Sequence, residues 1–276
     1  MELQGKDQAA SAKGASATAR QGQLKGGSKG ADAAAGNPNG AGAAAAEFGA
    51  MTAHGRHHPI IGQRKAGSTR ALLGGARDFW AIYVGHRLDP VFREVIMLAV
   101  AGADSSRQCS FAHREWALAE GLSRTDLAAL EGLQADAFDE RTWAAIAWAQ
   151  ALARSDFADV PAAIDANFRQ QFSAQERADI ELAARTMYWL NETSNGVDAF
   201  LSRMKRDPVP GSTLPSELVA LVLYAIAVPI LVIMFSVKRR CNPISILRGM
   251  KPFFREFETR GPNTISGLGE RAATAS

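Results

Sequence analysis

The sequence REVIMLAVAGADSSRQCSFAHREWALAEGLS, at residues 93–123, decides the fold of this chain. In its first part, Val95, Leu98 and Ala101 recur at intervals of three residues, which is the spacing of one buried helix face. Its second part continues a helical pattern as far as Gly121, a residue type that commonly ends helices. The stretch therefore predicts two consecutive helices joined by a short turn.

The helical pattern extends to both sides, over about residues 68–206. Ser68 can cap a helix that ends near Tyr83, and the capping box Ser-Ala-Gln-Glu at 173–176 predicts a long helix to Leu190 or beyond. No stretch alternates with a period of two, so we expect no strands. The prediction is an all-α bundle of roughly six to eight helices. The other helices are expected at about 90–101, 106–120, 123–133, 140–154, 161–171 and 195–205.

A thiol, an imidazole and a carboxylate lie close together in this pattern. Cys109 and His113 are four residues apart, so on a helix they share a face and lie one turn apart. Glu94 lies one predicted helix earlier. Because a thiol is nucleophilic as its thiolate, a neighbouring base is the partner that it needs. We therefore interpret Cys109, His113 and Glu94 as a candidate catalytic group, in which Glu94 or His113 accepts the thiol proton directly or through water.

These motifs resemble the carboxymuconolactone decarboxylase family, and especially its alkylhydroperoxidase D-like branch. Members of that branch show Arg-Glu, then Cys-x-x-Cys-x-x-x-His about a dozen residues later, then Gly-Leu-Ser. Glu94, Cys109 and His113 fall on the glutamate, the second cysteine and the histidine of that pattern. The resemblance covers roughly residues 70–206 and implies an alkylhydroperoxidase D-like helical bundle, which we place at 66–206.

One position departs from the family pattern, because Ser106 stands where the first cysteine is expected. In two-cysteine members the second cysteine attacks the peroxide, and the first resolves the resulting sulfenic acid as a disulfide. The resemblance implies that Cys109 keeps the attacking role and that His113 protonates the leaving alkoxide. Ser106 can hydrogen-bond the thiolate but cannot form a disulfide, so recycling needs an external thiol reductant. This interpretation predicts a peroxidase with peroxiredoxin-type, antioxidant activity.

Two other functions stay open at this point. The family includes decarboxylases, and the resemblance equally allows an enzyme that acts on a small lactone or carboxylic acid, with proton transfers by Glu94 and His113. Loss of the Cys-x-x-Cys pair also allows a catalytically inactive oligomeric scaffold. Because family members are usually trimers or hexamers, the resemblance implies a homo-oligomer. The sequence shows no nucleotide loop or flavin motif. His54, His57 and His58 resemble a small metal-binding tract, but no Cys or carboxylate lies beside them, so we expect no cofactor.

The charge distribution separates the predicted bundle from the two tails. Between Arg70 and Arg206 there are 15 Lys and Arg against 19 Asp and Glu, whereas the rest of the chain has 16 against 9. A mildly acidic folded region lacks the clustered Lys and Arg that phosphate contacts need, so nucleic-acid binding is not expected. Residues 1–65 are rich in Ala, Gly and Ser, which predicts a disordered segment.

The C-terminal part predicts attachment to a membrane. A Pro-containing break at 207–217 precedes an uncharged, mostly apolar segment at 218–237, and a basic tail follows at 238–276. About 20 helical residues cross a bilayer core of about 30 Å. The alternative is a buried core helix, but the break favours a separate, membrane-spanning helix. Lipid hydroperoxides would then be a peroxide substrate close to the site.

The orientation in the membrane is contested by two signals. More Lys and Arg follow the apolar segment than precede it, which places the C-terminal side in the cytoplasm by the positive-inside rule. However, no targeting segment is visible, and a reactive thiol suits the reducing side of a membrane. We expect a single-pass membrane protein with the helical domain in the cytoplasm.

Overall fold

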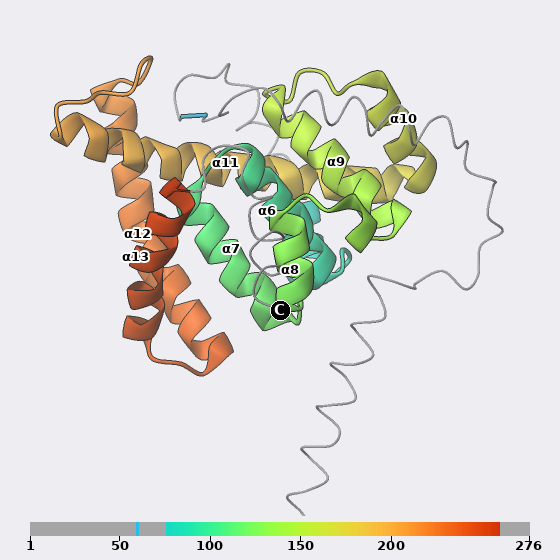
Figure 1. Cartoon of the computed structure of the whole chain (residues 1–276), viewed down its shortest axis with the longest axis horizontal. Helices are drawn as coiled ribbons and strands as arrows, with labels where there is room; N and C mark the ends of the chain where they lie inside the picture. Colours follow the sequence, from blue (N-terminus) through green and yellow to red (C-terminus); the bar gives the residue numbers. More distant parts are fainter. Residues whose placement is uncertain (1–58, 61–75, 260–276) are drawn as a thin grey trace, which may run out of the picture.

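The computed structural model describes residues 59–60 and 76–259, and within these ranges it contains helices and turns but no strand (Figure 1). This confirms the predicted all-α class. The α-helices in chain order are α5 (Ala76–Tyr83), α6 (Pro90–Ala103), α7 (Arg107–Glu120), α8 (Arg124–Glu131), α9 (Glu140–Arg154), α10 (Ala162–Gln171), α11 (Ala174–Met204), α12 (Leu214–Arg239) and α13 (Pro243–Thr259), with a short 3-10 helix at Ala135–Ala137.

Local sequence signals set the ends of the helices that carry the candidate site. Asp89 accepts a hydrogen bond from the backbone amide of Phe92 and so caps the start of α6. Gly121 adopts a left-handed conformation with φ of 112°, which ends α7 after Glu120. The predicted capping box of Ser173 and Glu176 starts α11. The signals at Gly121 and Ser173 were predicted from the sequence, whereas the cap at Asp89 was not.

Helix α11 is longer than the sequence suggested, because the prediction placed a separate helical piece after Leu190. It runs without a break from Ala174 to Met204 and contains the buried Gly196. A glycine inside a helix costs about 1 kcal/mol relative to alanine. Packing of Met187 and Tyr188 in the core outweighs this cost, since both side chains are fully buried.

Helix α6 lies in the centre of the bundle. One of its faces, with Ile96 and Val100, packs in the main core with α9 and α11. The opposite face, with Val95 and Leu98, packs in a second cluster near α7 and α8. Burial on both sides holds α6 rigidly, so side chains near its start, including Glu94, have fixed positions.

Two residues near the N-terminus correct part of the predicted disorder at 1–65. Ile60 is buried, and the side-chain amide of Asn195 donates a hydrogen bond to the backbone oxygen of Pro59 at 3.0 Å. This part of the chain therefore contacts the middle of α11. The rest of the predicted disordered segment lies outside the described residues.

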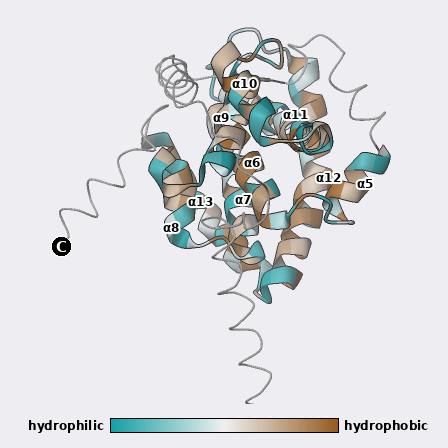
Figure 2. Ribbon diagram, turned by 90° about the vertical axis from the view of Figure 1, so that its right-hand side faces the viewer, coloured by the Kyte–Doolittle hydropathy of each residue, from teal (hydrophilic) through white to brown (hydrophobic). Residues whose placement is uncertain are grey.

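The C-terminal helices lie against the bundle. Helix α12 is, among the described residues, the one helix that is long and apolar enough to cross a membrane, judged by length and composition. The expectation that the Pro-containing break would separate it from the bundle is wrong, because α12 contacts α11 and α7. Its outward-facing side chains are hydrophobic, as the brown ribbon of α12 in Figure 2 illustrates.

Part of the predicted basic tail forms helix α13 at Pro243–Thr259. This helix returns along α12 and packs on α7, where Phe253 and Phe111 lie with ring centroids 5.4 Å apart. Ile246 is buried in the same cluster. The tail was expected to be loosely ordered, but its apolar side chains recur at helical spacing and find partners on α7 and α12. Residues 260–276 lie outside the described residues.

Candidate active site

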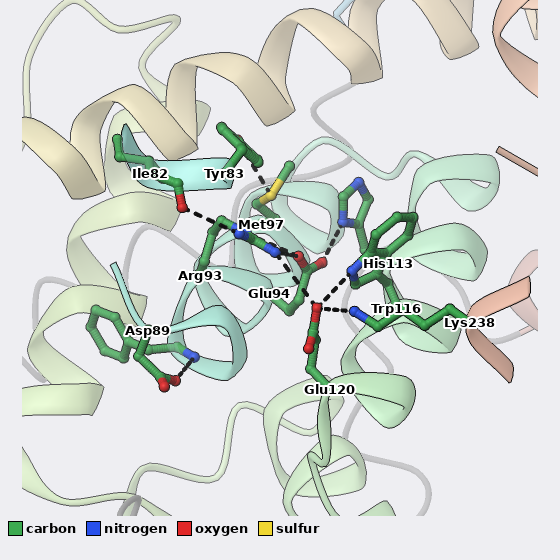
Figure 3. Close-up of polar contacts among 11 residues, drawn as sticks. Ile82, Tyr83, Asp89, Arg93, Glu94, Met97, His113, Trp116, Glu120 and Lys238 are labelled. Atoms are coloured by element: carbon green, nitrogen blue, oxygen red, sulfur yellow. Dashed lines mark hydrogen bonds and ion pairs between the residues drawn. The ribbon is translucent and has the colours of Figure 1, made fainter. Parts of the chain in front are cut away.

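Helices α6 and α7 bring two of the predicted site residues into contact. The Nδ1 atom of His113 lies 2.7 Å from Oε2 of Glu94, and the Glu94 side chain is almost fully buried (Figure 3). The other carboxylate oxygen, Oε1, accepts hydrogen bonds from Nε and Nη2 of Arg93, at 3.2 and 3.0 Å. Both oxygens of Glu94 are therefore fixed by neighbouring donors.

This arrangement keeps Glu94 ionised. Burial on its own would raise the pKa of the carboxyl group, but the charges and hydrogen bonds of His113 and Arg93 outweigh burial and lower it. An ionised carboxylate accepts the Nδ1–H of His113, which leaves Nε2 as the nitrogen that can take up or give a proton. The His113 side chain is 16% exposed, so a small molecule can reach it.

Arg93 has further contacts that fix its position. It donates to the backbone oxygen of Ile82 at 3.4 Å, and its guanidinium lies over the ring of Tyr83, 4.9 Å from the centroid. A carboxylate oxygen of Glu120, at the end of α7, lies 3.9 Å from Nη2 (Figure 3). Sequence reasoning used Arg93 as part of an Arg-Glu motif but did not assign it this role. Its position directly before Glu94 was the available signal.

Cys109 lies in a different environment, although it is one turn from His113 on the same helix. Its sulfur is 3.2 Å from the hydroxyl of Ser194 on α11, and that hydroxyl is 2.7 Å from the hydroxyl of Ser106. Among the described residues, neither Glu94 nor His113 makes a hydrogen bond with this sulfur. A transfer of the thiol proton to that pair through water stays a prediction.

The surroundings of Cys109 favour the neutral thiol. Burial raises the pKa of the thiol to about 11, hydrogen bonds from Ser194 and Ser106 lower it only in part, and the carboxylates of Asp104 and Asp198 raise it. At pH 7 a thiol with this pKa is ionised in only about one molecule in ten thousand. This arrangement therefore does not activate the Cys109 thiol through a neighbouring base, contrary to the expectation from the sequence.

Sequence reasoning missed the contribution of α11 to the site. Ser194 and Asp198 lie one helical turn apart on α11, and Asp198 binds the guanidinium of Arg107 through both carboxylate oxygens, at 2.8 and 3.0 Å. Gln108 also donates to Asp198, at 2.8 Å. These residues are about 90 positions apart in the sequence, and no local motif marks them. Only the packing of α11 on α7 brings them together.

A metal centre does not emerge from the described residues, among which no group of three or more His, Cys, Asp and Glu side chains could hold an ion. The histidines at 54, 57 and 58 lie outside them. Among the salt bridges of the described residues, the one between Arg93 and Glu94 has both side chains almost fully buried, and His113 contacts the same carboxylate.

The fold and the site together define a class of protein. It is a helical bundle in which a buried glutamate orients a histidine, and a cysteine one turn away on the same helix makes a hydrogen bond with a serine. Residues 74–151 match the model of the carboxymuconolactone decarboxylase family. The match includes Glu94, Cys109 and His113 and is consistent with the alkylhydroperoxidase D-like branch. It covers less than half of the chain. No curated protein and no solved structure gave a significant match.

Proposed function

We propose that the helical domain is an enzyme that acts by proton transfer at His113, on a small lactone or carboxylic acid. The observation that carries this proposal is the 2.7 Å contact between His113 and the ionised, nearly inaccessible Glu94. The description of the matched family, which names a lactone decarboxylase, supports the substrate class. Domains of this family are often enzymes, and general acid–base catalysis is the chemistry that such a pair provides.

The proposed roles follow from the geometry. Nε2 of His113 takes up or gives the proton, while Glu94 holds the ring in one orientation and stabilises the imidazolium that forms. Arg93 keeps the Glu94 carboxylate from turning away. When a carboxyl group leaves as carbon dioxide, its bonding electron pair stays on the substrate carbon. The imidazolium of His113 then supplies the proton that this carbon needs.

The experiment is a screen of the full chain against lactones and small carboxylic acids, with the product detected by mass spectrometry. His113→Ala and Glu94→Gln should each lower turnover by about 100- to 10,000-fold, the usual contribution of a general acid or base. Cys109→Ser should leave turnover nearly unchanged. The matched control is His86→Asn, because His86 is exposed and asparagine tolerates its positive φ of 54°. Loss of turnover in Cys109→Ser, with His113→Ala active, would contradict the proposal.

A second candidate is the thiol peroxidase that the family resemblance suggested. The observation that favours it is the pair of hydroxyl groups, from Ser194 and Ser106, close enough to the Cys109 sulfur to stabilise a thiolate. The thiolate would attack a peroxide, so that an S–O bond forms and the O–O bond breaks. The leaving alkoxide would take its proton from His113, and two external thiol groups would reduce the sulfenic acid to thiol and water while they form a disulfide with each other. Hydrogen peroxide or a lipid hydroperoxide would be the substrate.

A peroxidase assay separates the two candidate functions. Peroxide consumption by the full chain with a dithiol reductant is measured for Cys109→Ser and for Cys241→Ser. A peroxidase loses activity only in the first variant, because Cys241 lies in the turn between α12 and α13. If no variant changes either assay and both rates equal the uncatalysed ones, the domain is a scaffold and both proposals are wrong.

We also propose that α12 attaches the chain to a membrane as a single-pass anchor, with the domain on the cytoplasmic side. Two observations support attachment, namely the length and apolar composition of α12 and the cluster Lys238-Arg239-Arg240 at its end. Flotation of the full chain with vesicles, compared with a chain cut after residue 206, tests this attachment. Recovery of both chains in the soluble fraction would contradict it.

We propose further that the domain forms a homo-oligomer. Phe79 and Trp80 on α5 are 41% and 66% exposed, which is unusual for large apolar side chains on a folded domain and typical of an interface. Light scattering of the purified chain should give a mass of two or more copies, and Trp80→Glu should lower it. A monomeric mass for the unaltered chain would contradict this proposal.

A further inference from the structure

The hairpin of α12 and α13 covers one side of α7, the helix that carries Cys109 and His113. The ring of Trp116 on α7 meets Phe235 of α12 edge-on, with centroids 4.8 Å apart. Phe253 of α13 packs on Phe111 of α7. Figure 1 shows α12 and α13 side by side at the edge of the bundle, next to α7. Movement of the hairpin would therefore expose α7 directly.

Ion pairs hold α12 to the bundle at both ends. Near its start, Glu217 is buried and binds Nε and Nη2 of Arg203 on α11, at 2.7 and 2.9 Å. Near its end, Lys238 pairs with Glu120 and Arg239 pairs with Glu115, both on α7. The helix between Glu217 and Lys238 is about 32 Å long, at about 1.5 Å per residue.

This length equals the hydrocarbon core of a bilayer, which is about 30 Å thick. If the docked α12 spanned a membrane, the parts of α7 and α11 beside it would also lie in the hydrocarbon. They carry Arg107, Arg114 and Asp198, and charged side chains at that depth are strongly disfavoured. The docked position and a spanning position of α12 therefore exclude each other.

The docked hairpin contacts the site at two places. At the first, α12 packs against α7 and α11, the helices that carry Cys109 and Asp198, and its Tyr224 interacts electrostatically with both residues. On the other side, Lys238 pairs with Glu120, which lies 3.9 Å from Arg93, and Arg93 holds Glu94 (Figure 3). Removal of the hairpin would expose the first place and leave Glu120 without Lys238 at the second.

We propose that the hairpin of α12 and α13 is a removable cover of the site and that a bilayer containing anionic lipids competes with the bundle for α12. The bilayer is the occupant that the exposed face of α12 fits. That face is a continuous apolar stripe, and Lys238, Arg239 and Arg240 follow it where anionic headgroups would lie. The stripe consists of Val219, Val222, Ile226, Ile230, Ile233 and Val237. The inference deepens the proposed membrane attachment and is independent of which reaction the site performs.

The native Cys109 reports the position of the cover, because its side chain is 9% exposed when α12 is docked. The full chain is treated with iodoacetamide at pH 8, alone and with vesicles of phosphatidylcholine and phosphatidylglycerol, and alkylation of Cys109 is followed by mass spectrometry. Vesicles should accelerate alkylation about tenfold or more, because local opening controls reaction of a buried group. Vesicles of phosphatidylcholine alone should have a smaller effect.

Charge reversals test the cover without a membrane. Glu115→Arg breaks the pair with Arg239 and should accelerate alkylation of Cys109 in solution, and the added change Arg239→Glu should restore the slow rate. Glu181→Arg, which breaks the exposed pair with Arg185 on α11, is the matched control and should change nothing. None of these residues belongs to the pair of Glu94 and His113 or contacts Cys109.

Three results would overturn the proposal. If the chain floats with the vesicles while Cys109 reacts at its solution rate, α12 binds lipid without leaving the bundle. If the chain does not bind the vesicles, the bilayer is not the competitor. If Glu181→Arg accelerates alkylation as much as Glu115→Arg, the effect is a general loss of stability. Because alkylation measures access and not turnover, failure of the proposed enzymatic function leaves this test unaffected.

Discussion

Two positions on α7, one turn apart, have opposite electrostatic environments. His113 faces an ionised carboxylate that Arg93 holds in place, whereas Cys109 faces the neutral hydroxyl of Ser194 in a buried setting. The first environment prepares a group to transfer protons, and the second keeps a group neutral. Two residues that lie one turn apart on the same helix therefore need not share a role. The neighbouring helices set the role of each residue, because α6 supplies Glu94 to His113 and α11 supplies Ser194 to Cys109.

The largest expected effect is that of Glu94→Gln on stability. The change removes the charge from the carboxylate that accepts two hydrogen bonds from the buried guanidinium of Arg93, which is 4% exposed, so the free energy of unfolding should fall by about 3 kcal/mol. Chemical denaturation of the full chain in a mild detergent, followed by circular dichroism, measures this. Glu181→Gln on the exposed face of α11 is the control and should change stability by less than about 0.5 kcal/mol. Equal losses of stability in the two variants would contradict a stabilising role of the buried ion pair between Arg93 and Glu94.

The same carboxylate should make stability depend on pH in the acid range. Because the pKa of Glu94 is lower in the folded state than the unfolded value of about 4.3, its contribution is fully present above that value. It is lost as the pH falls through the folded-state pKa. Denaturation at pH 6, 5, 4 and 3 should therefore show a steeper loss for the unaltered chain than for Glu94→Gln. Parallel curves would contradict an ionised Glu94.

The thiol on the other side of the comparison should respond to alkaline pH. Burial raises the pKa of Cys109 to about 11 from an ordinary 9.0, so the rate of alkylation should still be rising at pH 10. The reaction of a cysteine peptide should level off near its own pKa under the same conditions. The raised pKa also makes the folded state lose stability as the pH rises above about 9. A rate that levels off below pH 8 would show a thiolate activated by its neighbours.

The smallest effect is expected for Ser194→Ala. The hydroxyl of Ser194 lowers the pKa of Cys109, so its removal should shift the alkylation profile to still higher pH. Loss of one neutral hydrogen bond should cost about 1 kcal/mol of stability. The pH profile of alkylation and one denaturation curve check both statements. A shift to lower pH would mean that Ser194 accepts the thiol proton and does not stabilise the thiolate.

The sequence predicted the features that depend on near neighbours in the chain. The cap at Ser173, the stop at Gly121 and the shared face of Cys109 and His113 all arise within about ten residues, and the structure contains them. Glu94 was also expected within reach of His113, because the two residues lie on consecutive predicted helices. In each case a local rule and the tertiary fold agree.

The features that the sequence missed depend on distant partners. Ser194 reaches Cys109 because α11 continues past Leu190, where the prediction placed a break between two helical pieces. The docking of α12 depends on pairs such as Arg203 with Glu217, whose charges looked like ordinary flanks of an apolar segment. Burial then reversed the expectation for Cys109, because the burial of its sulfur near Asp104 and Asp198 cannot be read from the spacing of two residues on one helix.

The most direct test of the account is the rate at which Cys109 of the full chain forms sulfenic acid. The unaltered chain, Glu94→Gln and His113→Ala are exposed briefly to hydrogen peroxide with a sulfenic-acid trap, and trapped Cys109 is quantified by mass spectrometry. The account predicts labelling no faster than that of a free cysteine, and equally slow in all three chains. Rapid, stoichiometric labelling that is lost in both variants would contradict it and would make Cys109 the group that the pair of Glu94 and His113 serves.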